Sequence, residues 1–322
     1  MAAIDPTPLA AATSWLQSTT RVIAALAPEA PQAGLDVKQA DGSFTWLRAF
    51  GGRTYEEAEG SLSRFDNTFY GAALGVDRPL TANLRTGVML GGLGGSSSLA
   101  SGYGNTGSQM IIAGTYARYD SGASYLKAAL QLGYGSQTSS RWSNNNLLLS
   151  GRETSTGSTD NWYFSPELKL GHRFSLGRVG HGTLFLSTEA QFRYLYGSYG
   201  TYSEVGGTDG FALSGRSTQS TEEQLTLKLS HVSSPAAGQQ IRYNLTAGLL
   251  GSQSLGNPML QGSLLGQSIT FAQPGASDWI GALAGLGVEF IHGKTTVFAQ
   301  ADYVGLSHGT DLSGRVGVKV MF

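Results

Sequence analysis

The sequence predicts an all-β fold, a monomeric transmembrane β-barrel of 12 antiparallel strands preceded by one α-helix. Three observations predict this fold. Only 13% of the 322 residues are charged, about half the usual share, and the 46 glycines are about twice the average. Polar and apolar side chains alternate along most of the chain, and the connections between the alternating segments are short and long in turn. These features are typical of outer-membrane barrels, whose strands present one face to lipid and the other to a polar lumen.

The composition excludes several classes of protein. The net charge of −1 gives no strong electrostatic attraction to nucleic acid. Cysteine is absent, so neither a disulfide framework nor a thiolate site is possible. The mean hydropathy is −0.10 and no apolar run of about 18 residues occurs, so no transmembrane helix is expected. A soluble β-sandwich or β-solenoid is the alternative to the barrel, but a sandwich core would leave the charges on the polar strand faces unpaired.

The first element is a helix, which we expect over Thr7–Ala27. Thr7 suits an N-cap, Pro8 suits the first helical position, and Pro28 ends the helix. About 20 residues of helix span about 30 Å, the thickness of a bilayer's hydrocarbon core. Hydroxyl side chains and an arginine in its middle make this helix too polar for lipid, and no basic segment precedes it as in a signal peptide. We therefore expect two units, a helix with a linker over residues 1–42 and a barrel over residues 43–322.

The barrel strands are predicted from period-two alternation, which is clearest at the C-terminus. There Leu312, Val316 and Phe322 fall on one face, whereas Arg315 and Lys319 fall on the other. In an outer-membrane barrel the apolar face meets lipid and the polar face lines the lumen. The same alternation predicts strands over residues 43–54, 65–78, 82–94, 107–120, 123–138, 158–176, 182–199, 214–233, 239–254, 277–291, 294–307 and 310–322.

The connections between these strands predict the orientation of the barrel. Five of them are long and rich in glycine, serine and asparagine, so we expect loops on the cell surface, whereas the short turns between them face the periplasm. The long loops are expected over residues 54–64, 95–106, 138–157, 200–213 and 254–277. Aromatic residues are expected in two girdles, Tyr134, Trp162, Tyr194, Tyr196 and Trp279 near the outer interface and Tyr119, Tyr125, Phe174, Phe290 and Phe322 near the inner one.

Several segments in order resemble one known family. Residues 46–52, WLRAFGG, are similar to the first-strand pattern W-x-R-x-F-G of that family. Residues 70–77, YGAALGVD, are similar to its second-strand pattern G-x-x-x-G-x-D, and residues 85–91 fit its third strand. The chain also ends in alternating apolar residues with Phe322 last. Together with the helix before the first strand, these segments resemble the C-terminal translocator (β) domain of bacterial autotransporters, over nearly the whole chain.

This resemblance implies a function in type V protein secretion across the outer membrane of a Gram-negative bacterium. The barrel would anchor and export an N-terminal passenger, and the helix would then plug the pore. The implied partners are the chain's own passenger, the barrel-assembly machinery, periplasmic chaperones and outer-membrane lipids. We expect contacts between helix and barrel at Leu16, Arg21, Ile23, Trp46, Arg48 and Phe50, and an assembly signal at Val318, Val320 and Phe322.

Two features of the N-terminal region bear on the passenger. No asparagine precedes Asn67, so release of the passenger by cyclisation of an asparagine in the helix is not expected. The passenger then stays attached, is cut by another protease, or has lost the original residue. Because an exported precursor needs a signal peptide, we also expect that Met1 does not begin the full precursor.

Two other function classes stay open at this point. One is a stand-alone outer-membrane porin, in which residues 1–27 are periplasmic or form a plug. The other is an outer-membrane hydrolase, for which His231 on a strand and His308 near Asp302 and Asp311 are the candidates. No pair of histidines has metal-ligand spacing and no G-x-S-x-G motif occurs, so the sequence predicts no enzyme, no metal and no cofactor.

Overall fold

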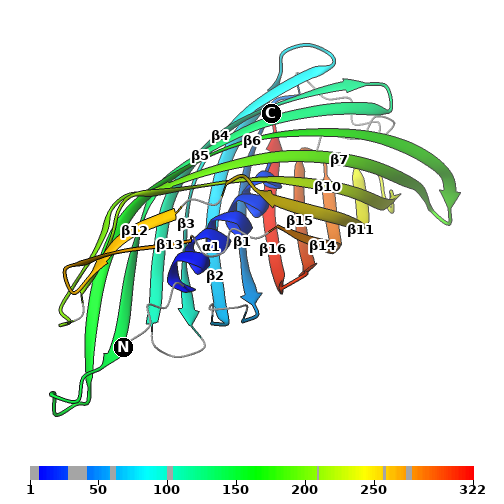
Figure 1. The fold of residues 1–322 in the computed structure, drawn as a ribbon. Coiled ribbons are helices and arrows are strands. Elements are labelled where there is room, and N and C mark those ends of the chain that lie inside the picture. The colour runs from blue at the N-terminus through cyan, green and yellow to red at the C-terminus, as the bar shows by residue number, and fades with distance from the viewer. Residues whose placement is uncertain are drawn as a thin grey trace.

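The computed structural model describes residues 7–27, 42–58, 63–99, 104–208, 210–256, 259–272 and 278–322. Helix α1 (Thr7–Ala24) lies inside a curved wall of strands (Figure 1). It begins where expected and ends three residues earlier than the predicted Ala27. Its predicted stop at Pro28 and most of the linker over residues 28–42 lie outside the described residues. Within the described ranges, no helix is long and apolar enough to cross a membrane.

Twelve long antiparallel strands form a closed barrel, which confirms the predicted fold. Each strand pairs with the next one in the barrel, and β1 pairs with β16 from Phe44 and Met321 to Glu56 and Gly309, which closes the wall. Closure gives every barrel strand a partner on both sides, as a strand in lipid requires. The barrel strands are β1 (Phe44–Glu56), β2 (Phe65–Pro79), β3 (Leu84–Leu99), β4 (Gly104–Ser121), β5 (Ser124–Asn144), β6 (Arg152–Val179), β7 (Gly182–Tyr199), β10 (Arg216–Ser233), β11 (Gln239–Ser254), β14 (Trp279–His292), β15 (Thr295–Leu306) and β16 (Gly309–Met321).

The expected alternation separates an apolar outer face from a polar inner face. Leu225 and Val316 are exposed on the outside, whereas Arg193, Glu222 and Arg315 are buried inside. Charged residues in the interior of a folded barrel are stable only when they are paired, and ion pairs between neighbouring strands line this lumen. Two aromatic side chains do not lie in the girdles predicted for them. Tyr125 and Trp279 are buried and point inward, because each shares the parity of lumen residues on its strand.

Two of the predicted long loops contain strands instead, which corrects the sequence-based boundaries. The short strands β8 (Tyr202–Val205), β9 (Phe211–Leu213), β12 (Met259–Leu264) and β13 (Gln267–Ala272) extend one end of the barrel, in the order β6, β8, β9, β12, β13. We call these four strands the arm. β5 and β6 also run beyond their predicted ends at 138 and 158, and project with the arm beyond the barrel in Figure 1. Polar residues, mostly serine and threonine, fill the added ends of β5 and β6, so no apolar period indicated them.

Candidate functional site

The apolar side of α1 packs against the wall formed by β1 to β7. Trp15, Leu16 and Ile23 belong to one buried cluster with Trp46 and Phe50 of β1. Glycine on the wall permits this close approach at two places. A Cβ at position 197 would lie 2.7 Å from Leu16 Cδ2, and one at position 95 would lie 2.5 Å from Trp15 Nε1. The helix therefore fits against the inner wall over much of its length.

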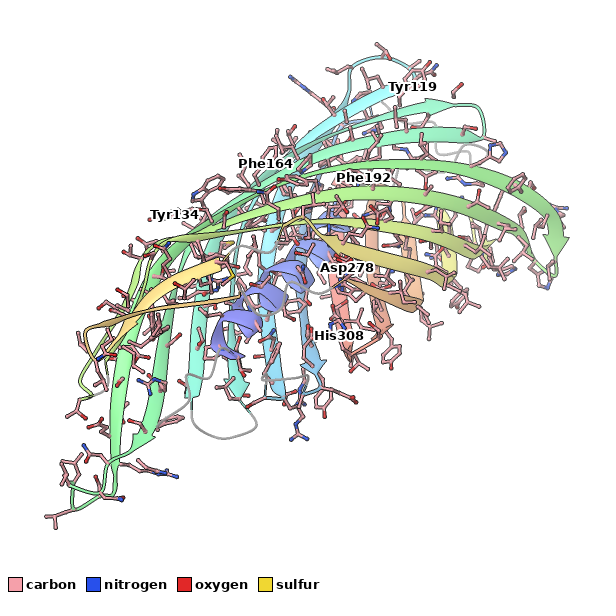
Figure 2. The ribbon with its side chains drawn as sticks, in the orientation of Figure 1. Tyr119, Tyr134, Phe164, Phe192, Asp278 and His308 are labelled. Carbon is pink, nitrogen blue, oxygen red and sulfur yellow. The ribbon has the colours of Figure 1, made fainter. Side chains whose placement is uncertain are left out.

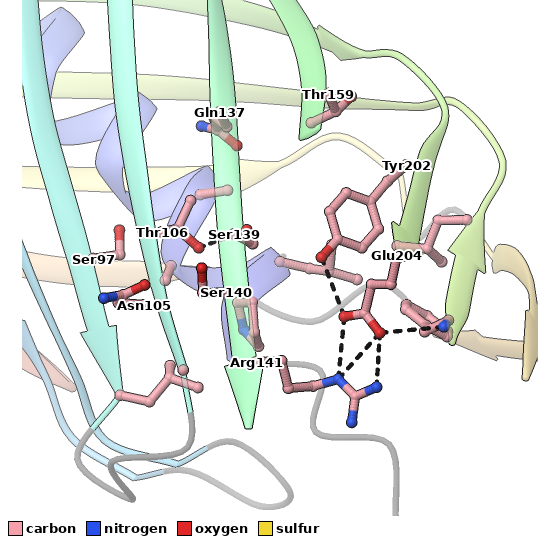
Figure 3. Close-up of a pocket in the computed structure, with 18 of the residues that line it drawn as sticks. Ser97, Asn105, Thr106, Gln137, Ser139, Ser140, Arg141, Thr159, Tyr202 and Glu204 are labelled. Atoms are coloured by element: carbon pink, nitrogen blue, oxygen red, sulfur yellow. Dashed lines mark hydrogen bonds and ion pairs between the residues drawn. The ribbon is translucent and has the colours of Figure 1, made fainter. Parts of the chain in front are cut away.

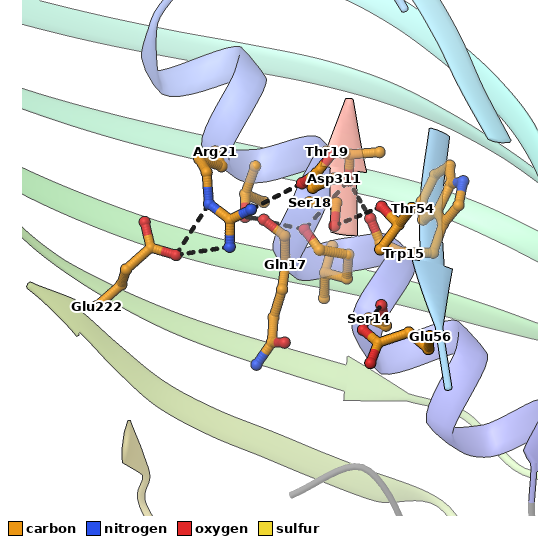
Figure 4. Close-up of polar contacts among 12 residues, drawn as sticks. Ser14, Trp15, Gln17, Ser18, Thr19, Arg21, Thr54, Glu56, Glu222 and Asp311 are labelled. Carbon is orange, nitrogen blue, oxygen red and sulfur yellow. Dashed lines mark hydrogen bonds and ion pairs between the residues drawn. The ribbon is translucent and has the colours of Figure 1, made fainter. Parts of the chain in front are cut away.

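Arg21 connects the helix to two separate strands of the barrel, β10 and β16. Its Nε and Nη2 donate to Glu222 Oε2 of β10 at 3.1 and 2.9 Å, and its Nη1 donates to Asp311 Oδ2 of β16 at 2.7 Å (Figure 4). Arg193 of β7 also contacts Glu222 Oε2, at 2.9 Å. The side chains of Arg21, Glu222 and Asp311 are only 13%, 5% and 3% exposed. Charge-assisted hydrogen bonds in so enclosed a place are strong, so Arg21 anchors the helix.

The C-terminal end of α1 is held by barrel cations. Ala25 O accepts hydrogen bonds from Arg48 Nη1 at 3.2 Å and from Arg315 Nη1 at 2.9 Å. Lys127 Nζ donates to Ala24 O at 3.4 Å. These cations satisfy carbonyls that have no partner within the helix, and they complement the negative end of the helix dipole.

The hydroxyl-rich side of the helix has polar partners on β1 and β2. Ser14 Oγ donates to Glu56 Oε1 at 2.9 Å, and Thr54 Oγ1 donates to Ser18 Oγ at 2.9 Å. Asn67 Nδ2 donates to the carbonyl of Ala11, at 3.1 Å. Burial of these polar groups is tolerated because each is hydrogen-bonded. A helix too polar for lipid is thus accommodated in the lumen.

The residues predicted to mediate helix contacts lie between α1 and the inner wall, and those predicted for assembly lie at the C-terminal end of the chain. Leu16, Ile23, Trp46 and Phe50 share one cluster, and Arg21 and Arg48 bond to the barrel and the helix respectively. The partners Glu222, Asp311 and Glu56 were not among the predicted site residues. Strand parity already places Glu222 and Asp311 on the inner face, whereas Glu56 lies in the loop predicted over residues 54–64, into which β1 extends. On β16, Val320 and Phe322 are exposed, and Val318 lines a shallow groove of about 560 Å³ on the outer wall.

A cavity of about 970 Å³ opens where α1 begins. It lies between the start of the helix at Pro8 and Leu9, the extended ends of β4 and β5, and the arm (Figure 3). We call it the vestibule. Glu204 of the arm accepts hydrogen bonds from Arg141 Nη2 at 2.7 Å, from Tyr202 Oη at 3.2 Å and from the Phe211 amide at 3.2 Å. One carboxylate therefore ties the arm to β5 and closes one side of the vestibule.

Replacing Glu204 is expected to loosen the arm without unfolding the barrel. Glu204→Gln removes the charge that holds Arg141, at a cost of about 2 kcal/mol for a charge-assisted hydrogen bond. Hydrogen exchange of the amides in β8 and β9 should therefore accelerate roughly thirtyfold, while exchange in β10 stays unchanged. Glu57→Gln changes an exposed carboxylate at the same end of the barrel and serves as the control. Equal exchange in both variants would show that backbone pairing alone holds the arm.

The two histidines considered for a hydrolase lie beside groups other than the predicted aspartates, and His308 Nδ1 lies 3.2 Å from Ser307 Oγ. His308 Nε2 lies 3.0 Å from Glu56 Oε2, while Asp302 and Asp311 bond to arginines instead. His231 Nε2 lies 3.2 Å from the carbonyl of Val179. In the part of the chain that the structure describes, no cluster of three or more histidines or carboxylates could hold a metal ion.

This chain is similar to known proteins both in sequence, to the model of one family, and in structure. The model of the autotransporter beta-domain matches residues 45–302. The translocator domain of the autotransporter NalP from Neisseria meningitidis matches with a TM-score of 0.71 and 20% identity, covering 97% of this chain and 98% of that one. The beta domain of the Bordetella autotransporter BrkA matches with a TM-score of 0.66 and 19% identity, covering 88% and 100%. The transport unit of AIDA-I from Escherichia coli matches with a TM-score of 0.62 and 13% identity, covering 99% and 100%.

No match is found among curated proteins. The structural identities are low, so these similarities establish the fold, and the family model establishes the family. The family model covers most of the chain, from the second residue of β1 to a point within β15. The fold is that of a transport and anchor domain, and its apolar outer wall suits a position in lipid. With the helix inside a closed 12-stranded wall, this chain belongs to the autotransporter β-domain family, whose barrels are integral to the bacterial outer membrane.

Proposed function

We propose that this barrel exports an N-terminal passenger to the cell surface, anchors it there, and is then plugged by α1. The observation that carries the proposal is the position of the helix start. Pro8 and Leu9 line the vestibule at the end of the barrel that bears the long strands and the arm. The helix end, by contrast, lies among the cations of the periplasmic half of the lumen. A chain that precedes α1 would therefore leave the barrel at this end, as an exported passenger joined to the helix must.

The same proposal includes the partners of assembly. Val318, Val320 and Phe322 end the strand that closes the barrel against β1, and two of them are exposed on the lipid side. A terminal strand with exposed apolar residues suits recognition by the barrel-assembly machinery, and periplasmic chaperones would deliver the unfolded chain. We propose that the barrel functions as a monomer and without catalytic activity of its own.

Surface display of a reporter tests the export function. A signal peptide and a small reporter domain are placed before Met1, and intact cells are treated with a protease. We expect digestion of the reporter while the barrel stays folded, as judged by its heat-modifiable migration. The same tag inserted between Ala236 and Ala237, in the short β10–β11 turn, is the control and should stay protected. A folded barrel with a protected N-terminal reporter would contradict export.

A further inference from the structure

We infer that one part of the periplasmic rim binds the headgroups of anionic phospholipids. Four of the five histidines lie there, outside the polar lumen. They lie on or between consecutive strands of the wall from β6 to β14, near the ends that the short turns join. We call these residues the histidine arc, which consists of His172, His181, His231 and His292.

The strand histidines of the arc face outward. The ring of His172 packs against Phe174 with centroids 4.5 Å apart, and the ring of His292 stacks parallel to Phe290 at 6.4 Å. Phe174 and Phe290 are 46% and 42% exposed on the lipid side. His231 lies opposite Tyr243, which is also exposed. The imidazoles therefore stand beside lipid-facing aromatic rings, at the level where headgroups meet the barrel.

Local contacts hold two of these rings in place. His172 Nδ1 lies 2.7 Å from Ser124 Oγ, the first residue of β5. His231 Nε2 lies 3.2 Å from the carbonyl of Val179, and its ring covers Gly182, where a Cβ would lie 2.5 Å from Nε2. Each contact uses one ring nitrogen. We assign the other nitrogen to a phosphate oxygen of the lipid, since an imidazole N–H is a good donor to an anion.

The charge of this rim has one sign. Residues 171–184, 229–240 and 290–297 contain no aspartate or glutamate, and they carry the exposed Arg178 in the β6–β7 turn and Lys294 in the β14–β15 turn. The β4–β5 turn outside the arc differs, because Asp120, which is 35% exposed, lies beside it. Basic residues at a membrane surface without opposing carboxylates attract anionic lipids. Arg178 and Lys294 thus favour anionic over zwitterionic headgroups, while the histidine arc binds the phosphate.

Lipid retention by the purified full chain tests this inference. The barrel is exchanged into mixed micelles with equal amounts of phosphatidylglycerol and phosphatidylcholine, and bound lipid is counted by native mass spectrometry. We expect the wild-type chain to retain phosphatidylglycerol roughly fivefold over phosphatidylcholine. The variant with His172, His181, His231 and His292 all changed to Gln should retain several times less of both lipids, because the imidazoles bind the phosphate that both carry. The double variant Arg178→Gln, Lys294→Gln should instead lose most of the preference for phosphatidylglycerol. His308→Gln is the matched control and should keep both the retention and the preference, because His308 lies in the β15–β16 turn at the opposite end of the barrel (Figure 2).

Two results would overturn the inference. One is equal lipid retention by the fourfold variant and the wild-type chain, and the other is no preference for phosphatidylglycerol in the wild-type chain. If the fourfold variant does not migrate as a folded barrel, the double variant His181→Gln, His292→Gln replaces it, since both side chains are exposed and changing them leaves the held rings intact. That variant should retain less of both lipids, and unchanged retention would likewise overturn the inference. The outcome is independent of passenger export.

Discussion

Removal of residues 7–27 is expected to increase the single-channel conductance of the barrel severalfold. Fourteen of the 18 residues of α1 are buried, and a helix with its side chains is about 10 Å across, so α1 fills much of the lumen. Without it, Arg48, Arg315 and Lys127 lose the carbonyls of the helix end and line the open pore. The enlarged channel should therefore prefer anions. Recording in planar bilayers, with a salt gradient to obtain the selectivity, measures both properties.

A peptide of residues 7–27 provides the control for this experiment. Added to the deleted barrel, it should restore the low conductance of the full chain, which would exclude collapse or enlargement of the barrel as the cause. A stand-alone porin would conduct well with the helix present, and equal conductance with and without the helix would contradict the plug. The recording therefore separates the proposed translocator from the porin alternative.

The barrel could be predicted from sequence because its physical cause is local. Each strand faces lipid on one side, so side chains alternate with period two wherever the strand lies in the membrane. Outside the membrane this constraint ends. The arm strand β12 pairs Gly262 with Leu213 of β9, across a long separation in sequence and with only a few residues on each side. Such strands carry too little pattern to be distinguished from a glycine- and serine-rich loop.

The helix anchors show the same limit at the level of single residues. Arg21 was expected to suit a polar lumen, and the parity of Glu222 and Asp311 places both on the inner face. Which carboxylates meet Arg21 depends on the closure of the wall, since β10 and β16 are separated by three strands. They depend equally on how deep the helix lies in the lumen. Neither the closure of the wall nor this depth produces a periodic pattern in the sequence, so the ion pairs of Arg21 could be identified only from the structure.

Arg21→Met is expected to weaken the docking of the helix more than any other single substitution of a polar helix residue. Glu222 keeps Arg193 as a partner, but Asp311, only 3% exposed, loses the cation that lies 2.7 Å from it. Removal of one partner from a buried ion pair costs about 3–5 kcal/mol. The chain has no cysteine, so a single Gln17→Cys substitution reports on the helix without interference. Its reaction with a bulky thiol reagent should accelerate by roughly a hundredfold or more in Arg21→Met.

Two further variants separate the ion network from apolar packing as the cause. Arg53→Met removes a surface pair with Asp66 in which Arg53 is 64% exposed, so it should cost less than about 1 kcal/mol and leave the labelling rate unchanged. Adding Asp311→Asn to Arg21→Met removes the one uncompensated charge, since Glu222 still pairs with Arg193, and should slow labelling again. If Arg21→Met instead reacts like its parent, Trp15 and Leu16 hold the helix by packing alone. Closure of the pore would then depend on shape, and the charges of the lumen would serve the passage of the chain.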